Sequence, residues 1–210
     1  MLSMMICGPK QPGNDIDVCL TPLLEELEKL WLEGVEVFDA VSREHFKMHA
    51  MLLCTINDFP AYGNLSGYSV KGHKACPICE EGTCYYQLKY GRKTVYLGHR
   101  RFLRSGHPYR RLKKAFNGHP ENAEAPTALS GHEVYQRVKD IHFVYGKTQK
   151  KSTERRLYKR CSIFLKKLPY FRDHPVRNCL DVMHVEKNVT ESLVGTLLNT
   201  PGKTKDSLNA

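Results

Sequence analysis

The stretch Met51–Pro60, MLLCTINDFP, combines an apolar run with an acidic residue and a chain break. The apolar run has the length of a buried strand, and the proline ends it. Asp58 therefore falls at the end of a predicted strand, a position at which functional carboxylates often lie.

The residues before this run predict a helix and a β-hairpin. Apolar side chains recur at helical spacing from Ile16 to Trp31, with acidic residues on the other faces. Asp15 and Asp17 are most simply helix-start residues at the positive end of this helix's dipole. The weakly alternating stretch 35–50 has a polar turn in its middle and predicts two antiparallel strands that lead into the apolar run.

A last helix is predicted from about Asn178 to Leu198, because its apolar residues recur mostly near one face. It carries Asp181 and Glu186, which lie five residues apart and therefore do not share a face well. Between these ends we expect a helix within 129–143, a polar and basic stretch at 146–160 and only a short apolar patch at 162–170.

The composition fits a folded chain in a reducing compartment. Its 210 residues suffice for one domain, or for one domain with a large insertion. It has no secretory signal and no apolar run long enough to cross a bilayer, which argues against a secreted or membrane protein. In a reducing compartment a Cys-x-x-Cys pair is more often metal-binding or redox-active than a structural disulfide. We expect no membrane partner and no small-molecule substrate.

The charge is divided unevenly along the chain. The net charge is +10, yet residues 1–60 hold ten acids and only four Lys or Arg. The remainder is therefore strongly basic, which is typical of a chain with a part that binds phosphate. A solvated basic surface without a partner is the alternative interpretation.

Cys76 and Cys79 are two residues apart, in front of a stretch crowded with Arg. Two such sulfurs make one edge of a tetrahedral zinc site, which His99 and His107 can complete. A structural zinc ion would then pin a loop that has few apolar residues of its own. The alternatives are a reduced, inert cysteine pair and, less favoured, a redox pair. The competing ligands are Cys84 and His73.

The residues between Thr83 and Pro120 include ten Lys and Arg and no Asp or Glu, and aromatic residues are interleaved with them. Guanidinium groups contact phosphates in a bidentate manner, and aromatic rings can stack on unpaired bases. We therefore predict a DNA-binding surface. The aromatic residues can equally form a small core under the loop, which is the role we expect for Phe102. The predicted DNA-binding residues are Arg92, Lys93, Arg100, Arg101, Arg104, Arg110, Arg111, Lys113 and Lys114.

Carboxylates that converge from separate elements can hold two divalent cations for phosphodiester cleavage and strand transfer. The candidates are Asp15, Asp17, Asp58, Asp181 and Glu186. Of these, we expect Asp58 at a strand end and Glu186 on a late helix to converge. Taken singly, each acid is more simply a helix cap or a surface charge.

Several stretches together resemble one family, the CACTA (En/Spm-type) plant DNA transposases, in their large catalytic protein. The similar stretches keep their order and span nearly the whole chain. They are Gly8–Val18, Thr55–Gly63, Leu65–Tyr68, Ala75–Cys79, Gly98–Leu103 with His107, Phe116–Gly118 and Leu180–Val189.

This resemblance implies an α/β fold in which a partial RNase H-like core is interrupted by a large zinc-stapled, basic insertion. It also implies a DDE triad that uses two Mg²⁺ ions, cuts DNA at transposon ends and joins it to a target. Asp58 would be the second acid of the triad and Glu186 the third. The predicted segments are a partial core at 1–60, the insertion at 61–175, a core helix at 176–200 and a tail at 201–210.

One expected residue has no counterpart. The family places the first aspartate of the triad upstream of the part that is similar to this chain. We therefore expect a nuclear transposase fragment that lacks its N-terminal part and is inactive alone. The alternatives are a non-catalytic, zinc-containing nucleic-acid-binding module, domesticated from such an element, and a protein-interaction domain. DNA is the expected partner, and a second copy of the chain is a further candidate.

Overall fold

The structure is a computed structural model that describes residues 3–9, 11–89, 93–146 and 156–200. The chain divides into two compact units, and each is described by itself. The first unit comprises Met1–Ser69 and Leu129–Val182, and the second comprises Val70–Ala128 and Met183–Ala210. Both combine helices with small sheets, in agreement with the predicted α/β class.

The helices of the first unit are α1 (Ile16–Leu32), α2 (Phe59–Ser66), α4 (Gly131–Val138) and α5 (Ile163–Lys167), with 3-10 turns η1 (Gly13–Asp15) and η4 (Pro169–Arg172). Its strands are β1 (Val35–Asp39), β2 (Glu44–Met48), β3 (Thr55–Asn57) and β6 (Asn178–Leu180). The second unit holds η2 (Glu80–Gly82), β4 (Tyr85–Gln87), β5 (Thr94–Tyr96), η3 (His99–Phe102), α3 (Pro108–Arg111) and all but the first residue of α6 (Val182–Leu197).

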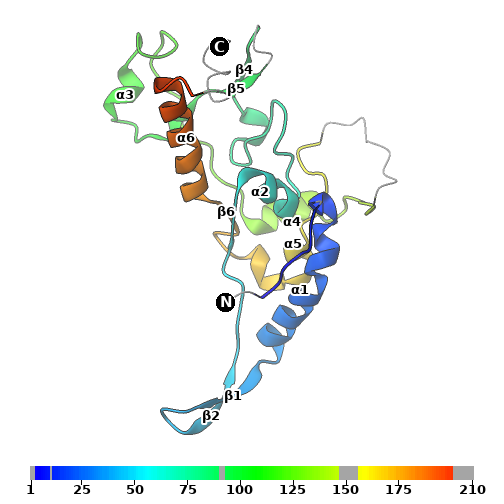
Figure 1. Cartoon of the computed structure of the whole chain (residues 1–210). Helices are drawn as coiled ribbons and strands as arrows, with labels where there is room; N and C mark the ends of the chain where they lie inside the picture. Colours follow the sequence, from blue (N-terminus) through cyan, green and yellow to red (C-terminus); the bar gives the residue numbers. More distant parts are fainter. Residues whose placement is uncertain (1–2, 10, 90–92, 147–155, 201–210) are drawn as a thin grey trace. The chain divides into compact units, whose positions relative to one another are not determined.

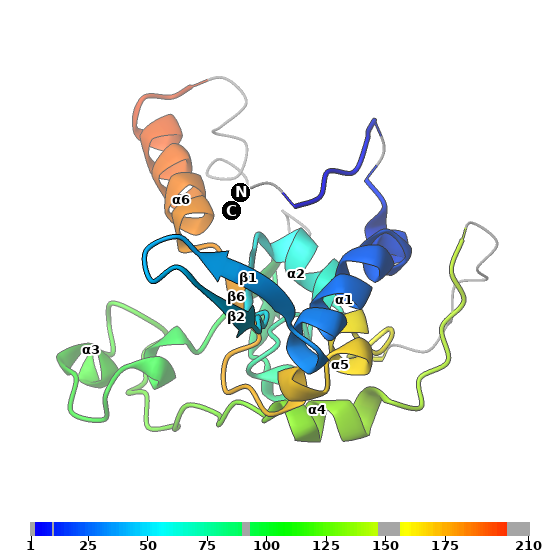
Figure 2. The same cartoon turned by 90° about the horizontal axis from the view of Figure 1, so that it is seen from below.

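The apolar core of the first unit is formed by helices. Leu20 and Leu24 of α1 pack with Val138 of α4 and with the apolar residues of segment 161–171. Figures 1 and 2 both show α1, α4 and α5 side by side. Segment 161–171, expected to be only a short apolar patch, supplies most of the buried apolar residues of this core. The two lysines that break the pattern lie in the last turn of α5, so the apolar residues on either side still reach one core.

A buried ion pair joins α1 to the segment that precedes α5. Asp17 is 2% exposed and Arg160 is fully buried, and the guanidinium of Arg160 contacts both the Asp17 carboxylate and the carbonyl oxygen of Asn64 in α2. The hydroxyl of Tyr145 donates to Asp17 Oδ2 at 3.0 Å. Burial raises the pKa of Asp17, and the charge of Arg160 opposes that shift. Asp17 is thus more than the helix-start residue predicted from sequence, although it does lie in the first turn of α1.

Two small sheets complete the first unit. β1 and β2 form an antiparallel hairpin where the alternating pattern predicts one. β3 pairs in parallel with β6, although β6 covers residues that were expected to open the last helix. β3 contains only three residues of the predicted strand, and Leu53 and Ile56 are 66% and 68% exposed. A two-stranded sheet gives neighbouring apolar side chains few partners, so this run is not the buried strand that its composition suggested.

The second unit consists mainly of loops around one short hairpin. β4 and β5 are antiparallel, with Tyr86 opposite Val95. Among the apolar residues that the structure describes in this unit, only Ala75 is buried. The unit contains residues 70–128 of the predicted insertion, whereas residues 129–175 belong to the first unit. Within the described ranges, no helix has the length and apolar character needed to cross a membrane.

Candidate functional site

The carboxyl ends of β3 and β6 place two aspartates at one edge of the sheet. The strands run in the same direction, and Asn57 pairs with Leu180. The next residue on each strand is an aspartate, Asp58 after β3 and Asp181 after β6. The Asp181 amide donates to the Asn57 carbonyl oxygen at 2.7 Å, so the parallel pairing extends to this edge. We call Asp58 and Asp181 the aspartate edge. Carboxyl ends of parallel strands are where α/β proteins commonly place ligand sites.

Local hydrogen bonds fix the aspartate edge. Asp58 Oδ1 accepts from the amide of Ala61 at 2.7 Å, so this carboxylate caps the N-terminus of α2. Below it, Thr55 Oγ1 donates to Asn178 Oδ1 at 2.9 Å and so connects the side chains of the two strands. Asp58 and Asp181 are both partly buried. The carboxylate of Asp58, held in this way, has a defined orientation.

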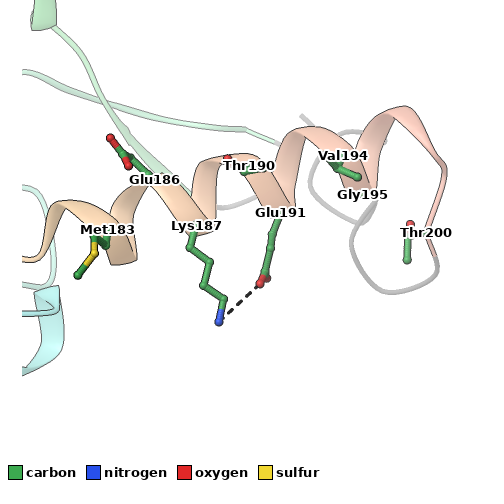
Figure 3. A pocket seen from close by; sticks show the side chains of 8 residues that line it. All are labelled: Met183, Glu186, Lys187, Thr190, Glu191, Val194, Gly195 and Thr200. Atoms are coloured by element: carbon green, nitrogen blue, oxygen red, sulfur yellow. Dashed lines mark ion pairs between the residues drawn. The ribbon is translucent and has the colours of Figure 1, made fainter.

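Glu186 lies on α6, which begins directly after Asp181. Figure 3 shows its carboxylate pointing away from the ion pair of Lys187 and Glu191, whose charged atoms are 3.8 Å apart. Glu186 also lines a groove that runs along α6 from Met183 to Thr200. Because most of α6 belongs to the second unit, the predicted convergence of Glu186 with the first unit's Asp58 stays a prediction.

The surroundings of Glu186 on its own helix are unusual for an acid. At 100° per residue, Glu186 lies on the side of α6 that carries Val182, Val189 and Leu193. Those three side chains are 64%, 53% and 60% exposed. Glu186 therefore lies beside this apolar stripe, where a carboxylate would be costly to bury without a cation.

Cys76 and Cys79 lie close together in the second unit. The Cys79 amide approaches the Cys76 sulfur, with N and Sγ 3.4 Å apart. A guanidinium nitrogen of Arg101 is 2.8 Å from Cys79 Sγ, and another is 3.8 Å from Cys84 Sγ. Burial raises the pKa of the Cys79 thiol and Cys76 adds to that shift, whereas Arg101 opposes it. Two thiols thus contact one cationic side chain, and a third lies beside Cys79.

The two predicted histidine ligands do not join this cysteine pair. In the part of the chain that the structure describes, no three His, Cys, Asp or Glu side chains gather closely enough to hold a metal ion. His107 Nδ1 accepts from the amide of Tyr109 at 3.2 Å and caps α3, while His99 lies in η3. The cysteines therefore fit one edge of a zinc site, and the arrangement supplies no completed set of ligands. Zinc coordination by Cys76, Cys79, His99 and His107 remains a proposal.

The predicted DNA-binding residues fall into two groups. Arg100 is 8% exposed and donates to the carbonyl oxygens of Tyr109, Leu112 and His119 at 2.7–3.2 Å, and to the Asn117 side chain. These hydrogen bonds connect the Arg100 guanidinium to residues 109–119 of the same loop and so stabilise it. Arg110 behaves in the same way: it is 6% exposed and donates to the carbonyl oxygens of Arg101, Leu103 and Ala123 at 2.7–3.0 Å.

The other group is exposed, and two of the predicted residues belong to neither group. Arg92 lies outside the described residues, and Arg101 contacts the thiols and is partly exposed. The cations that remain on the surface are Lys93, Arg104, Arg111, Lys113 and Lys114.

A protein-family model described as transposase family tnp2 matches residues 1–141, which is two thirds of the chain. The chain belongs to the tnp2 family of transposases. No curated protein and no solved structure matches it. Transposases act on DNA, so membership of the tnp2 family makes DNA the partner of this chain.

The tnp2 match includes Asp58, the cysteine pair and the whole basic stretch, whereas Asp181 and Glu186 lie beyond it. Sequence reasoning counted Asp181 among the candidate carboxylates but did not pair it with Asp58, because a three-residue strand at 178–180 carries no periodic signal. One signal was present. Both Asn57-Asp58-Phe59 and Leu180-Asp181-Val182 join the end of a strand to the start of a helix through an aspartate.

Proposed function

We propose that this tnp2 transposase chain carries part of a DDE-type site that cuts DNA at transposon ends and joins them to a target. The observation that supports this most directly is the parallel pairing of β3 with β6, which brings Asp58 and Asp181 to the same edge. Carboxylate oxygens from adjacent strands are the ligands that Mg²⁺ prefers in proteins. Bound there, Mg²⁺ would activate the attacking oxygen and neutralise the charge of the phosphodiester.

In this proposal Asp58 and Glu186 keep the roles of the second and third triad acids, and Asp181 joins them as a further ligand. α6 begins directly after Asp181, the second residue of the aspartate edge. The aspartate edge would bind and orient the metal ion.

The finer family assignment is part of the same proposal. The ordered stretches that resemble CACTA (En/Spm-type) plant transposases support a CACTA-type element, an RNase H-like parent core and action in the nucleus. The second unit would be the insertion between the second and third acids, pinned by a structural zinc ion on Cys76 and Cys79. The exposed cations near α3 would contact the DNA backbone. We also propose that the chain alone does not transpose, because the resemblance leaves the first acid of the triad without a counterpart and Asp181, as a further ligand, does not take its place.

Metal binding by the purified chain tests the proposed function. Isothermal titration with Mn²⁺, a stand-in for Mg²⁺, should show a site that Asp58→Asn or Asp181→Asn weakens by about tenfold or more. Asp140→Asn, which neutralises an exposed acid just after α4, is the matched control and should bind as the unchanged chain does. Equal Mn²⁺ affinity in all four proteins would contradict the proposal.

A second candidate function, a non-catalytic nucleic-acid-binding module, is favoured by one specific observation. The exposed cations of the second unit occur in a stretch, residues 84–119, that contains no acid. Phosphate binding by such a surface should weaken steeply as salt rises, because counterions are released. Salt-dependent DNA binding without a Mn²⁺ site at the aspartate edge would favour the module over the DDE site.

A further inference from the structure

Three aromatic side chains lie exposed on the loop that the two buried arginines organise. Phe102, Tyr109 and Phe116 are 48%, 56% and 47% exposed. Phe102 was expected to form a small core under the loop, and its exposure shows that it does not. The Tyr109 and Phe116 ring centroids are 6.4 Å apart with a tilt of 56°. We call Tyr109 and Phe116 the aromatic platform.

The aromatic platform is held in place, although the loop around it has little regular structure. The guanidinium of Arg100 lies 4.3 Å from the centroid of the Phe116 ring and also donates to the carbonyl oxygen of Tyr109. Arg110 fixes the end of α3 by its bonds to the backbone on either side. The Phe116 ring therefore rests on a buried side chain, whereas the Tyr109 ring packs edge to face on His107, with ring centroids 5.2 Å apart. Both rings have defined neighbours, so their exposure is not that of a loose surface loop.

Cations are interleaved with the aromatic platform in the sequence. Arg111, Lys113 and Lys114 lie between Tyr109 and Phe116 in the sequence, and all three are exposed. Phosphates of a nucleic-acid strand would be attracted to these side chains while its bases reach the rings.

We propose that the aromatic platform binds unpaired bases of a DNA strand, with one base stacked on Tyr109 and the adjoining phosphates on the neighbouring cations. Duplex DNA offers the same phosphates, but its bases are already stacked on one another. Exposed rings therefore add affinity only for a strand whose bases are unpaired. The tilt between the two rings prevents one base from lying between them, so each ring stacks separately. The inference deepens the proposed function, on which it rests, by naming single-stranded DNA as a substrate form.

Fluorescence anisotropy with a labelled 20-nucleotide strand, and with the same strand in a duplex, tests this inference. Tyr109→Ala should weaken binding of the single strand by about tenfold, and Phe116→Ala by a smaller factor, while duplex affinity changes by less than about twofold. Lys113→Gln with Lys114→Gln should weaken both forms and reduce the salt dependence. Phe38→Ala removes an aromatic side chain that is 53% exposed in the first unit, and it is the matched control.

The outcomes distinguish a failure of the aromatic platform from a failure of the proposed DDE site. Equal single-strand affinity in Tyr109→Ala and the unchanged chain, or equal losses on the two DNA forms, would overturn the aromatic platform. Tyr109→Leu, which keeps an apolar side chain without the ring, should bind single strands as weakly as Tyr109→Ala if stacking is the cause. The Mn²⁺ titration of the aspartate edge does not involve these residues, so its failure would contradict the DDE site and leave the platform standing.

Discussion

The two compact units of this chain are stabilised by different means. The first buries a continuous set of apolar side chains from α1, α4, α5 and η4, together with the ion pair of Asp17 and Arg160. The second buries little apolar surface, and two arginines hold its loops through backbone carbonyl groups. Apolar burial is non-directional, whereas a guanidinium fixes the positions of particular carbonyl groups. Apolar burial is enough for the unit that carries the carboxylates. The loop that presents exposed rings and cations depends on hydrogen bonds from arginine.

The largest loss of stability is expected from breaking the buried ion pair of the first unit. Arg160→Met removes one partner of the buried pair and leaves the Asp17 carboxylate without its cation. Its free energy of unfolding should fall by about 3–5 kcal/mol, because an uncompensated buried charge is costly. Urea denaturation followed by circular dichroism measures this, with the exposed Lys139→Met as the control. A change no larger than that of the control would show that the pair does not support this unit.

A smaller effect is expected from the buried arginines of the second unit. Arg100→Ala leaves several loop carbonyl groups without their donor, which should cost about 1–3 kcal/mol locally. Hydrogen exchange should then increase in residues 98–123 and stay unchanged in α1 and α5. The exposed Arg111→Ala serves as the control. An equal increase in hydrogen exchange in both units after Arg100→Ala would contradict the claim that the two units are stabilised by different means.

The smallest effect on the fold is expected from substituting the cysteine pair, because Arg100 and Arg110 already stabilise much of the loop. We predict one zinc ion per chain, lost in Cys76→Ser and Cys79→Ser. Elemental analysis of protein purified under reducing conditions measures it, and Cys7→Ser, at an exposed cysteine, is the control. His99→Ala, His107→Ala and Cys84→Ser then identify the remaining ligands. Protein without zinc would rule out the metal-pinned loop.

A strand-transfer assay on the purified chain tests whether the aspartate edge and the DNA-binding surface suffice for catalysis. We predict no Mg²⁺-dependent joining of transposon-end DNA to a target by this polypeptide alone. Gel analysis of labelled DNA checks it. A joined product that Asp58→Ala abolishes would show that a complete site assembles in this chain.

The parts of the fold that local patterns encode were predictable from the sequence. The helical spacing between Ile16 and Trp31 predicted α1, and the alternation after residue 35 predicted the hairpin of β1 and β2. The placement of Asp58 at the end of a strand also agrees with β3, which ends one residue before it.

The remainder depended on contacts between residues far apart in the chain. The pairing of β3 with β6 involves three residues on each side, too few to produce a periodic signal, so Asp181 was not recognised as a neighbour of Asp58. Arg160 is the last residue of the predicted polar and basic stretch and gave no sign that it would be buried against Asp17. Arg100 and Arg110 had the sequence context of DNA contacts, and only their bonds to loop carbonyl groups distinguish them from the exposed cations.

The aspartate edge is the central claim, and localised cleavage by bound iron tests it most directly. Fe²⁺ substituted for Mg²⁺, with ascorbate and peroxide, produces radicals that cut the backbone next to the metal, and mass spectrometry locates the cuts. We predict paired cuts near Asp58 and Asp181, both lost in Asp58→Asn and in Asp181→Asn and both retained in Asp140→Asn. Cuts confined to one of the two strands, or cuts that persist in both aspartate variants, would contradict a shared metal site at the carboxyl ends of β3 and β6.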